Sequence, residues 1–498
     1  MMRRLSLAAL DQLPDDVVRP CYEIASQKIG IVHLGIGAFH RAHQAVYVDT
    51  RLGAGERDWA ILGVSLRSAE TRDALQPQDG LYTVLARSGN EVCPRVIGSV
   101  RELLVAPENF GTLLDRMSEP NVRIVSLTVT EKGYCHDPAT GELDEDHPDI
   151  VHDLSAPLAP KSVPGLLVEA LRRRRDNRIA PFTVLCCDNL PSNGRTVRRV
   201  VTRFAELRDP EICRYIADEV AFPSTMVDRI VPATTDADRI LVSERLGVAD
   251  NWPVSTEPFS QWVIEDRFPT GRPRFELAGA VLVADVEPYE AMKLRLLNGS
   301  HSTLAYLGYL AGYETVADVM AVPAFARFVR DLMDEEITPT LHLPPDVDLE
   351  AYKDSLIERF HNTALHHRTW QIAMDGSQKL PQRLLGTARD RIRVGASIER
   401  IALAVAGWMR YVTGTDERGA AIDVRDPLAS RLRALADAAG PDASRLVPAL
   451  LGVREIFGED LPAEPRFIMP VRNALAALFT NGAAYAIRQM ADPVGASS

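Results

Sequence analysis

The chain has 498 residues, 46% of them apolar and 25% charged, with a formal net charge of −12. This length exceeds one ordinary hydrophobic core and predicts at least two domains. The negative charge argues against a nucleic-acid or anionic-membrane partner. No run approaches the ~20 apolar residues of a membrane span. The apolar N-terminal segment is too short for a signal peptide, so we expect a cytoplasmic protein.

The cysteines do not form a recognisable framework. No C-x-x-C pair or zinc-ligand spacing occurs among the six, so we expect neither disulfides nor a bound metal. They are Cys21, Cys93, Cys135, Cys186, Cys187 and Cys213.

The N-terminal part begins with a nucleotide-binding pattern. An apolar strand over residues 30–34 runs into Gly35-x-Gly37 and then a helix, although His40 stands where a third glycine is usual. A second strand is predicted over 59–66. After it, Glu70 could bond the ribose hydroxyls of NAD, or simply cap a surface helix. Arg67 could equally pair with the 2′-phosphate of NADP.

Two further apolar runs, over 124–130 and 182–187, predict strands buried on both faces of a parallel sheet. Between them, 137–164 is predicted to be a loop, followed by a helix over 166–175. Because open α/β sheets bind ligands at the carboxyl ends of their strands, Asn189 is a candidate oxyanion donor. Asn193 is better suited to capping the next helix.

From residue 289 the periodicity is helical. We place a domain boundary after a strand-like segment over 280–285. The expected fold is therefore α/β: a Rossmann-like dinucleotide-binding domain over 1–285 and a mostly α-helical domain over 286–498. The helices are predicted over 289–311, 322–336, 348–360, 397–413, 426–439 and 464–487.

The first of these helices carries three side chains that can move or hold protons: Lys293, Asn298 and His301. At ~100° per residue, Asn298 lies roughly 140° and His301 roughly 80° round from Lys293, so all three can face one cleft. A desolvated lysine can act as a general base, while an amide and an imidazole can hold an oxyanion. The alternative is a surface lysine, a helix-weakening Asn-Gly pair and a core histidine.

Met-Lys-Leu-Arg-Leu-Leu-Asn-Gly-Ser-His, residues 292–301, resembles the signature of the mannitol dehydrogenase and fructuronate reductase family. These are long-chain, metal-independent dehydrogenases of polyols and sugar acids, and the resemblance extends over roughly residues 20–490. It implies NAD as cofactor, an acidic residue at Glu70 and an oxyanion-hole role for Asn189. It also implies a cofactor turn made of Gly35, Gly37, Phe39, His40 and Arg41.

The expected site lies in the cleft between the two domains. Lys293 would take the proton of a secondary hydroxyl while hydride passes to the nicotinamide, with Asn189, Asn298 and His301 holding the oxygen. Glu290, one turn before Lys293, could pass the proton to solvent, or be only an exposed carboxylate at the start of the helix.

The family divides into polyol enzymes and hexonate enzymes, and a hexonate needs a cation for its carboxylate. The resemblance assigns substrate contacts to Asp228, Lys132, Arg368 and Lys379, whereas Arg295 lies roughly 160° round from Lys293 and is expected off the site. The segments over 130–134, which contains Lys132, and over 367–383 resemble the hexonate branch, which implies interconversion of D-mannonate and D-fructuronate. The alternative is a mannitol 2-dehydrogenase or a related hexitol or pentitol dehydrogenase. Neither the hexonate nor the polyol interpretation determines the oligomeric state, and both are compatible with a monomer.

Overall fold

The computed structural model of the chain describes residues 2–137, 140–344 and 347–491. Its contacts divide the chain into two compact units, residues 1–287 and 288–498. No helix within the described residues is long and apolar enough to cross a membrane.

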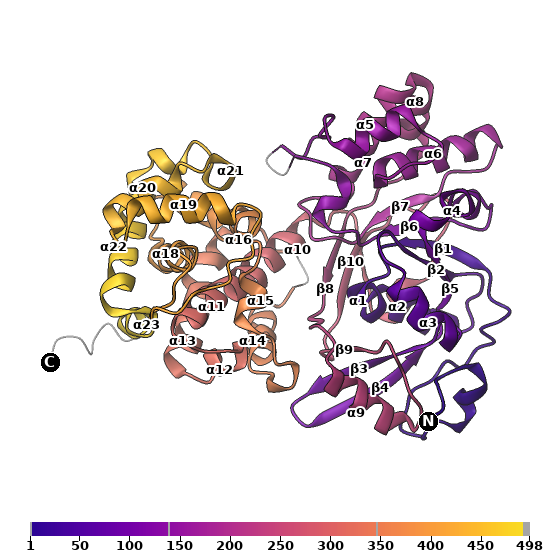
Figure 1. The fold of residues 1–498 in the computed structure, drawn as a ribbon, viewed down its shortest axis with the longest axis horizontal. Helices are drawn as coiled ribbons and strands as arrows, with labels where there is room; N and C mark the ends of the chain where they lie inside the picture. The colour runs from indigo at the N-terminus through magenta and orange to yellow at the C-terminus, as the bar shows by residue number, and fades with distance from the viewer. Residues whose placement is uncertain (1, 138–139, 345–346, 492–498) are drawn as a thin grey trace. The chain divides into compact units, whose positions relative to one another are not determined.

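The first unit is built around a five-stranded parallel sheet with the order β5-β2-β1-β6-β7 (Figure 1). This sheet confirms the predicted Rossmann-type fold, and four of its strands lie where the sequence predicts them. The strands are β1 (Ile29–Leu34), β2 (Ala60–Ser65), β5 (Val100–Val105), β6 (Ile124–Leu127) and β7 (Thr183–Cys186).

Both faces of this sheet are buried, which explains its continuous apolar runs. In β1, Val32 and Leu34 pack into a cluster with Leu113, Leu167 and Val200, whereas Ile31 packs into a cluster with Val48 and Trp262. The helices of this unit are α1 (Ala38–Ala42), α2 (Gln44–Gly53), α3 (Glu70–Leu75), α4 (Phe110–Met117), α5 (Pro148–Ser155), α6 (Val163–Asp176), α7 (Asn193–Arg208), α8 (Pro210–Glu219) and α9 (Asp236–Leu246).

Two small sheets and the helices α4, α5, α8 and α9 of this unit were not predicted, although β11 (Val281–Val283) lies within the strand-like segment over 280–285. Most pairings in these sheets join strands that are distant in sequence, and local periodicity cannot indicate such pairings. The exception is the antiparallel hairpin of β3 (Tyr82–Ser88) and β4 (Glu91–Ile97). Helix α5 lies inside the segment predicted as a loop, where His147 accepts the N–H of Asp149 at its start. The additional strands are β3 (Tyr82–Ser88), β4 (Glu91–Ile97), β9 (Val254–Thr256), β8 (Thr225–Asp228), β10 (Gln261–Glu265) and β11 (Val281–Val283).

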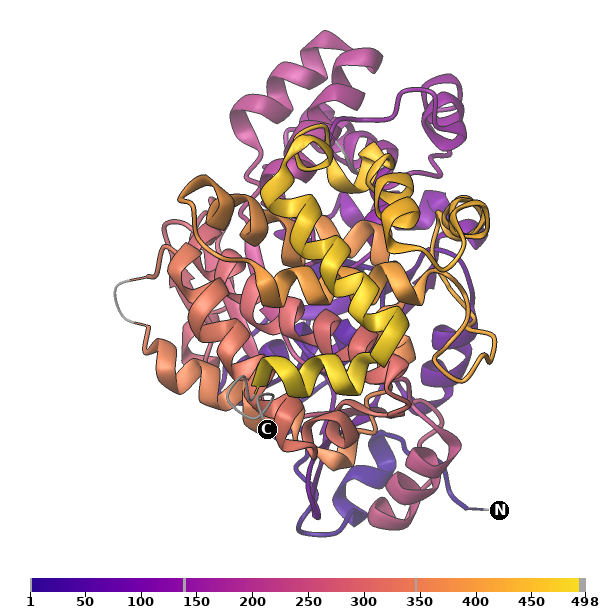
Figure 2. The same cartoon turned by 90° about the vertical axis from the view of Figure 1, so that its left-hand side faces the viewer.

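The second unit is helical, as predicted. The last predicted helix is divided at Gly482, whose φ of +79° ends α22 (Pro465–Asn481). Helix α22 packs against α18 (Glu399–Tyr411) (Figure 2). The helices are α10 (Glu287–Met292), α11 (Gly299–Leu310), α12 (Val316–Met320), α13 (Pro323–Asp331), α14 (Leu349–Phe360), α15 (Thr369–Ala373), α16 (Gly376–Leu380), α17 (Gly386–Arg393), α18 (Glu399–Tyr411), α19 (Ala429–Ala439), α20 (Ala443–Leu451), α21 (Arg454–Phe457), α22 (Pro465–Asn481) and α23 (Ala483–Ala491).

The predicted regular helix over 289–311 is wrong in its middle. Lys293–Asn298 form a π-helical segment between α10 and α11. A π-helix bonds residues five apart and is wider than an α-helix, so the angles expected at ~100° per residue do not hold there. The backbone at Gly299 lies close to a second π-helical segment, Pro381–Leu385, and a Cβ at Gly299 would come within 2.7 Å of the Arg383 carbonyl oxygen. Glycine therefore permits this close approach.

Candidate active site

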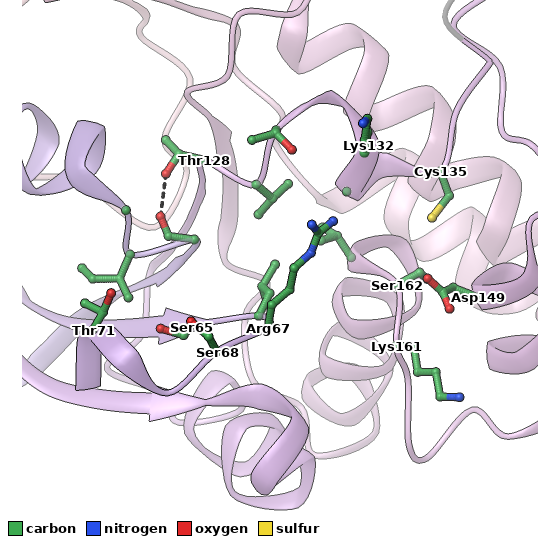
Figure 3. Close-up of a pocket in the computed structure, with 18 residues that line it drawn as sticks. Ser65, Arg67, Ser68, Thr71, Thr128, Lys132, Cys135, Asp149, Lys161 and Ser162 are labelled. Atoms are coloured by element: carbon green, nitrogen blue, oxygen red, sulfur yellow. Dashed lines mark hydrogen bonds between the residues drawn. The ribbon is translucent and has the colours of Figure 1, made fainter. Parts of the chain in front are cut away.

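The turn after β1 requires glycine at its first position. Gly35 has φ +96°, and a Cβ there would lie 2.0 Å from the carbonyl oxygen of Thr128. Gly37 is the N-cap of α1. In Figure 3 the Thr128 hydroxyl donates to the Gly35 carbonyl at 2.8 Å, which joins this turn to the end of β6. Both glycines line a pocket, so the cofactor turn opens onto it.

The ends of β2 and β6 supply polar walls to the same pocket. Ser65, Arg67 and Ser68 line it from β2, and Lys132 lines it from the segment after β6 (Figure 3). Arg67 is exposed and makes no hydrogen bond or ion pair with any residue in the described part of the chain. Glu70 starts α3, is exposed, and is not among the residues that line the pocket. The hydroxyls and cations suit the ribose and phosphates of a dinucleotide.

Three residues of the predicted cofactor turn lie away from this pocket. His40 is buried and stacks on His33, with ring centroids 3.3 Å apart, and burial holds the pKa of His40 well below its usual range. Arg41 is buried and donates to the Trp252 carbonyl at 2.6 Å. Phe39 stacks against His43 at 5.1 Å. In this structure these side chains of α1 pack against neighbouring residues and do not line the pocket.

The end of β7 carries the other predicted residue of this unit, Asn189. Its neighbour Asp188 accepts the N–H groups of Val129 and Thr130 at 2.9 and 3.2 Å, and the Tyr134 hydroxyl at 2.6 Å. Burial raises the pKa of Asp188. Asp188 therefore joins the ends of β6 and β7, and Asn189 follows it as an exposed residue. Asp228 is buried at the end of β8.

In the second unit, the π-helical segment and α11 bury all three residues proposed for proton chemistry. Lys293 is 4% exposed, and Asn298 and His301 are each 7% exposed. Burial is the main cause that holds the pKa of His301 well below its usual range, and the charges of Arg359, Arg383 and Lys293 contribute. His301 is therefore neutral. Its Nε2 is buried and has no hydrogen-bond partner among the described residues.

His367 and Lys379 lie in the same neighbourhood. The His367 ring is perpendicular to that of His301, with centroids 5.2 Å apart. Burial, and then the charge of Lys379, lowers the pKa of His367 to about 4. The Lys379 ammonium donates to the Met374 carbonyl at 2.5 Å. Arg383 donates to the Ser302 hydroxyl at 3.1 Å. This neighbourhood of His301 thus gathers several cations.

The remaining predicted residues of this unit are placed differently. Arg368 is exposed and pairs with Glu314 at 3.3 Å. Arg295 pairs with Asp390 at 2.7 Å and donates to Thr340, as expected for a side chain off the site. Glu290 is half-buried in α10.

Family models match both parts of this chain. A mannitol dehydrogenase Rossmann domain matches residues 29–277, and a mannitol dehydrogenase C-terminal domain matches residues 285–479. The chain belongs to the mannitol dehydrogenase family. As a member, it is an oxidoreductase that acts on secondary alcohols.

Individual relatives cover almost the whole chain. The uncharacterized oxidoreductase YeiQ of Escherichia coli K12 is 51% identical over 95% of this chain and 97% of its own. The D-mannonate oxidoreductase of the same organism is 49% identical over 94% of this chain and 96% of its own. The solved Pseudomonas fluorescens mannitol 2-dehydrogenase, in a ternary complex with NAD and D-mannitol, is 41% identical with a TM-score of 0.92, covering 98% and 99% of the two chains.

Several residues of the site were not selected from the sequence. Asp188 follows a predicted strand, and Thr128 lies near the end of another, so both could have been expected at the carboxyl end of the sheet, where ligands bind. His367 and Arg383 lie in a segment dense in polar residues, but only tertiary packing brings them beside His301.

Proposed function

We propose that this enzyme interconverts D-mannonate and D-fructuronate with NAD as cofactor. Bound at the pocket of Gly35 and Gly37, NAD would supply the acceptor for the substrate hydride. Lys293 would take the proton of the secondary hydroxyl. The amides of Asn298 and Asn189, together with His301, would hold the oxygen as charge develops on it.

The observation that carries this mechanism is the buried, unbonded Nε2 of His301 in the unit that also buries Lys293. A buried polar atom without a partner is destabilising, so it is retained where a ligand completes its hydrogen bond. A neutral imidazole can present an N–H to a substrate oxygen without adding a charge. Lys293, whose charge acts on His301, is then the residue available as the base.

The choice of a sugar acid is supported by the charges around His301. The charged side chains that act most strongly on it are Arg359, Arg383 and Lys293, and Lys379 acts on the adjacent His367. A carboxylate entering such a neighbourhood is stabilised by charge-assisted hydrogen bonds, whereas a neutral polyol is not. The 49% identity to a D-mannonate oxidoreductase agrees with this preference.

The second candidate is a mannitol 2-dehydrogenase. It is favoured by the TM-score of 0.92 to the mannitol-bound enzyme of Pseudomonas fluorescens. Both candidates share the proposed proton and hydride chemistry and differ only in the group that occupies the cationic neighbourhood.

The test of the proposal is the substrate preference of Lys379→Met. Loss of a charge-assisted contact worth roughly 1.5–3 kcal/mol lowers kcat/KM for mannonate about 10- to 100-fold, with little change for mannitol. Arg368→Met is the matched control, because its guanidinium pairs with Glu314 at the surface. Lys132→Met is expected to weaken NAD binding instead, since Lys132 lines the pocket of the glycine turn. Equal losses for both substrates in Lys379→Met would contradict the proposal.

A further inference from the structure

Three residues whose side chains can bind a metal ion lie close together beside the glycine-turn pocket. Ligand atoms of Cys135, His147 and Asp149 all lie within 4.8 Å of one another, and this is the one such group of histidine, cysteine or acidic donors found in the described residues. Cys135 is buried, and the other two side chains are half-buried. The three come from the turn after β6 and from the start of α5, so they converge only in the folded chain.

We propose that Cys135, His147 and Asp149 form a binding site for a zinc-like divalent cation, which competes with the dinucleotide for the pocket. A thiolate, an imidazole and a carboxylate together are ligands that Zn²⁺ takes in proteins. Zinc bonds of about 2.0–2.3 Å hold tetrahedral ligand atoms roughly 3.5 Å apart. The three donors are therefore near the spacing that the ion imposes.

The histidine is oriented for this role. Its Nδ1 lies 4.0 Å from the Asp149 carboxylate and, among the described residues, accepts one hydrogen bond, from the Asp149 N–H at 3.2 Å. A cation at Nδ1 would replace that bond at the exposed start of α5, where water can satisfy the N–H. Metal binding would also replace the proton of the Cys135 thiol, which passes to solvent.

The link to the cofactor comes from the lining of the pocket. Cys135 and Asp149 both line the pocket that contains Gly35 and Gly37, and Figure 3 shows them on one side of Arg67, away from Ser65 and Ser68. Three protein ligands leave one coordination position for water. An ion with its water would take up pocket volume that the dinucleotide needs, so each ligand would weaken the binding of the other by the same factor.

Zinc binding to the full-length enzyme, freed of metal with EDTA, tests the site. Competition with a chromophoric zinc indicator should show one tight zinc per chain. Cys135→Ser combined with His147→Asn should weaken that binding at least about 100-fold, since even residues that only support ligands are worth 10- to 100-fold. Asparagine is chosen because it can still cap α5. Cys213→Ser combined with His152→Asn is the matched control and should keep the zinc.

Two further measurements separate the site from its proposed effect. Zinc should raise the melting temperature of the unmodified enzyme and of the control, because a ligand that binds the folded state stabilises that state. The site variant, which lacks the ligands, should show no such rise. Saturating zinc should raise the Kd of NADH, followed by its fluorescence, at least about 5-fold. Wild-type zinc affinity in the site variant would overturn the site. An NADH affinity that zinc leaves unchanged would overturn the competition.

These outcomes do not depend on which substrate the enzyme oxidises. The chelated enzyme is the reference state, and we expect it to remain fully active, because none of the proposed catalytic groups is a metal ligand. Loss of activity on chelation, restored by zinc, would show instead that the cation assists the enzyme and would overturn the inhibitory role.

Discussion

His301 and His367 meet edge to face, with their ring centroids 5.2 Å apart at an interplanar angle of 89°. Both are held in the neutral form, chiefly by burial. A neutral pair can orient a substrate oxygen without repelling the cations nearby. The proposed removal of the substrate's hydroxyl proton therefore requires another group as the base, and we assign it to Lys293.

Replacing that base is the first prediction. Lys293→Ala should lower kcat by at least about 10²–10⁴-fold, the usual contribution of a general base. The affinity for NADH should stay within about threefold, because Lys293 is not among the residues that line the glycine-turn pocket. Stopped-flow turnover and fluorescence titration of NADH measure the two quantities. A variant with near-normal kcat would rule out Lys293 as the base.

Acid should destabilise the protein through its buried histidines. Burial lowers the pKa of His367 to about 4 and that of His33 to about 3, from an unfolded value of 6.5. Between these values the unfolded chain binds protons that the folded chain does not, so the free energy of unfolding falls as pH falls. The loss is at most about 1.4 kcal/mol per pH unit for each histidine.

Urea unfolding at pH 7 and pH 5 measures this loss. His367→Asn should reduce the difference between the two pH values, whereas substitution of its exposed neighbour, His366→Asn, should not. Equal pH dependence in His367→Asn and the unmodified protein would contradict the assignment of a neutral, buried His367.

The close contact at Gly299 gives a stability prediction. Gly299→Ala places a methyl group 2.7 Å from the Arg383 carbonyl oxygen, a backbone atom that cannot easily move. Overpacking of this kind should destabilise the fold by about 1–3 kcal/mol. Gly111→Ala in α4 is the control, since the nearest atom to its Cβ lies 3.6 Å away and alanine favours helix. Thermal unfolding compares the two, and equal melting temperatures would argue against the strained contact.

Cofactor choice should depend on Arg67 rather than on Glu70. Arg67 lines the pocket and has no partner among the described residues, whereas Glu70 lies outside the lining. Arg67→Ala should therefore weaken NADP, whose 2′-phosphate pairs with arginine, about 10-fold more than NAD. Glu70→Ala should change the ratio of the two kcat/KM values less than about threefold. A large gain of NADP activity in Glu70→Ala would restore the sequence-based assignment of Glu70 as the ribose ligand.

The sequence predicts those parts of the molecule that local patterns determine. Strands buried on both faces give continuous apolar runs, and Gly35 follows one of them, so the sheet and its turn were predictable. The π-helical form of Lys293–Asn298 was not, because it accompanies a tertiary contact between Gly299 and Arg383. The ion pair of Arg368 with Glu314 was likewise not predictable, because the two residues are fifty-four positions apart in the sequence.

Local sequence patterns also fail to predict groups of residues that come together from separate elements. Cys135 and His147 are twelve residues apart and follow no familiar ligand spacing, so the sequence suggested no metal. Likewise, nothing local distinguishes Arg67 from Glu70 as the residue that faces the pocket. In the structure, Arg67 lines the pocket and Glu70 does not.

The most direct test of the proposed function is the ratio of kcat/KM for D-mannonate to that for D-mannitol, measured with NAD on the unmodified enzyme. A charge-assisted contact to the substrate carboxylate predicts a ratio of about 10 to 100 in favour of mannonate. D-fructuronate and D-fructose with NADH should give the same order in the reverse direction. A ratio below one, with mannitol or another neutral polyol preferred, would contradict the sugar-acid assignment and favour the polyol dehydrogenase.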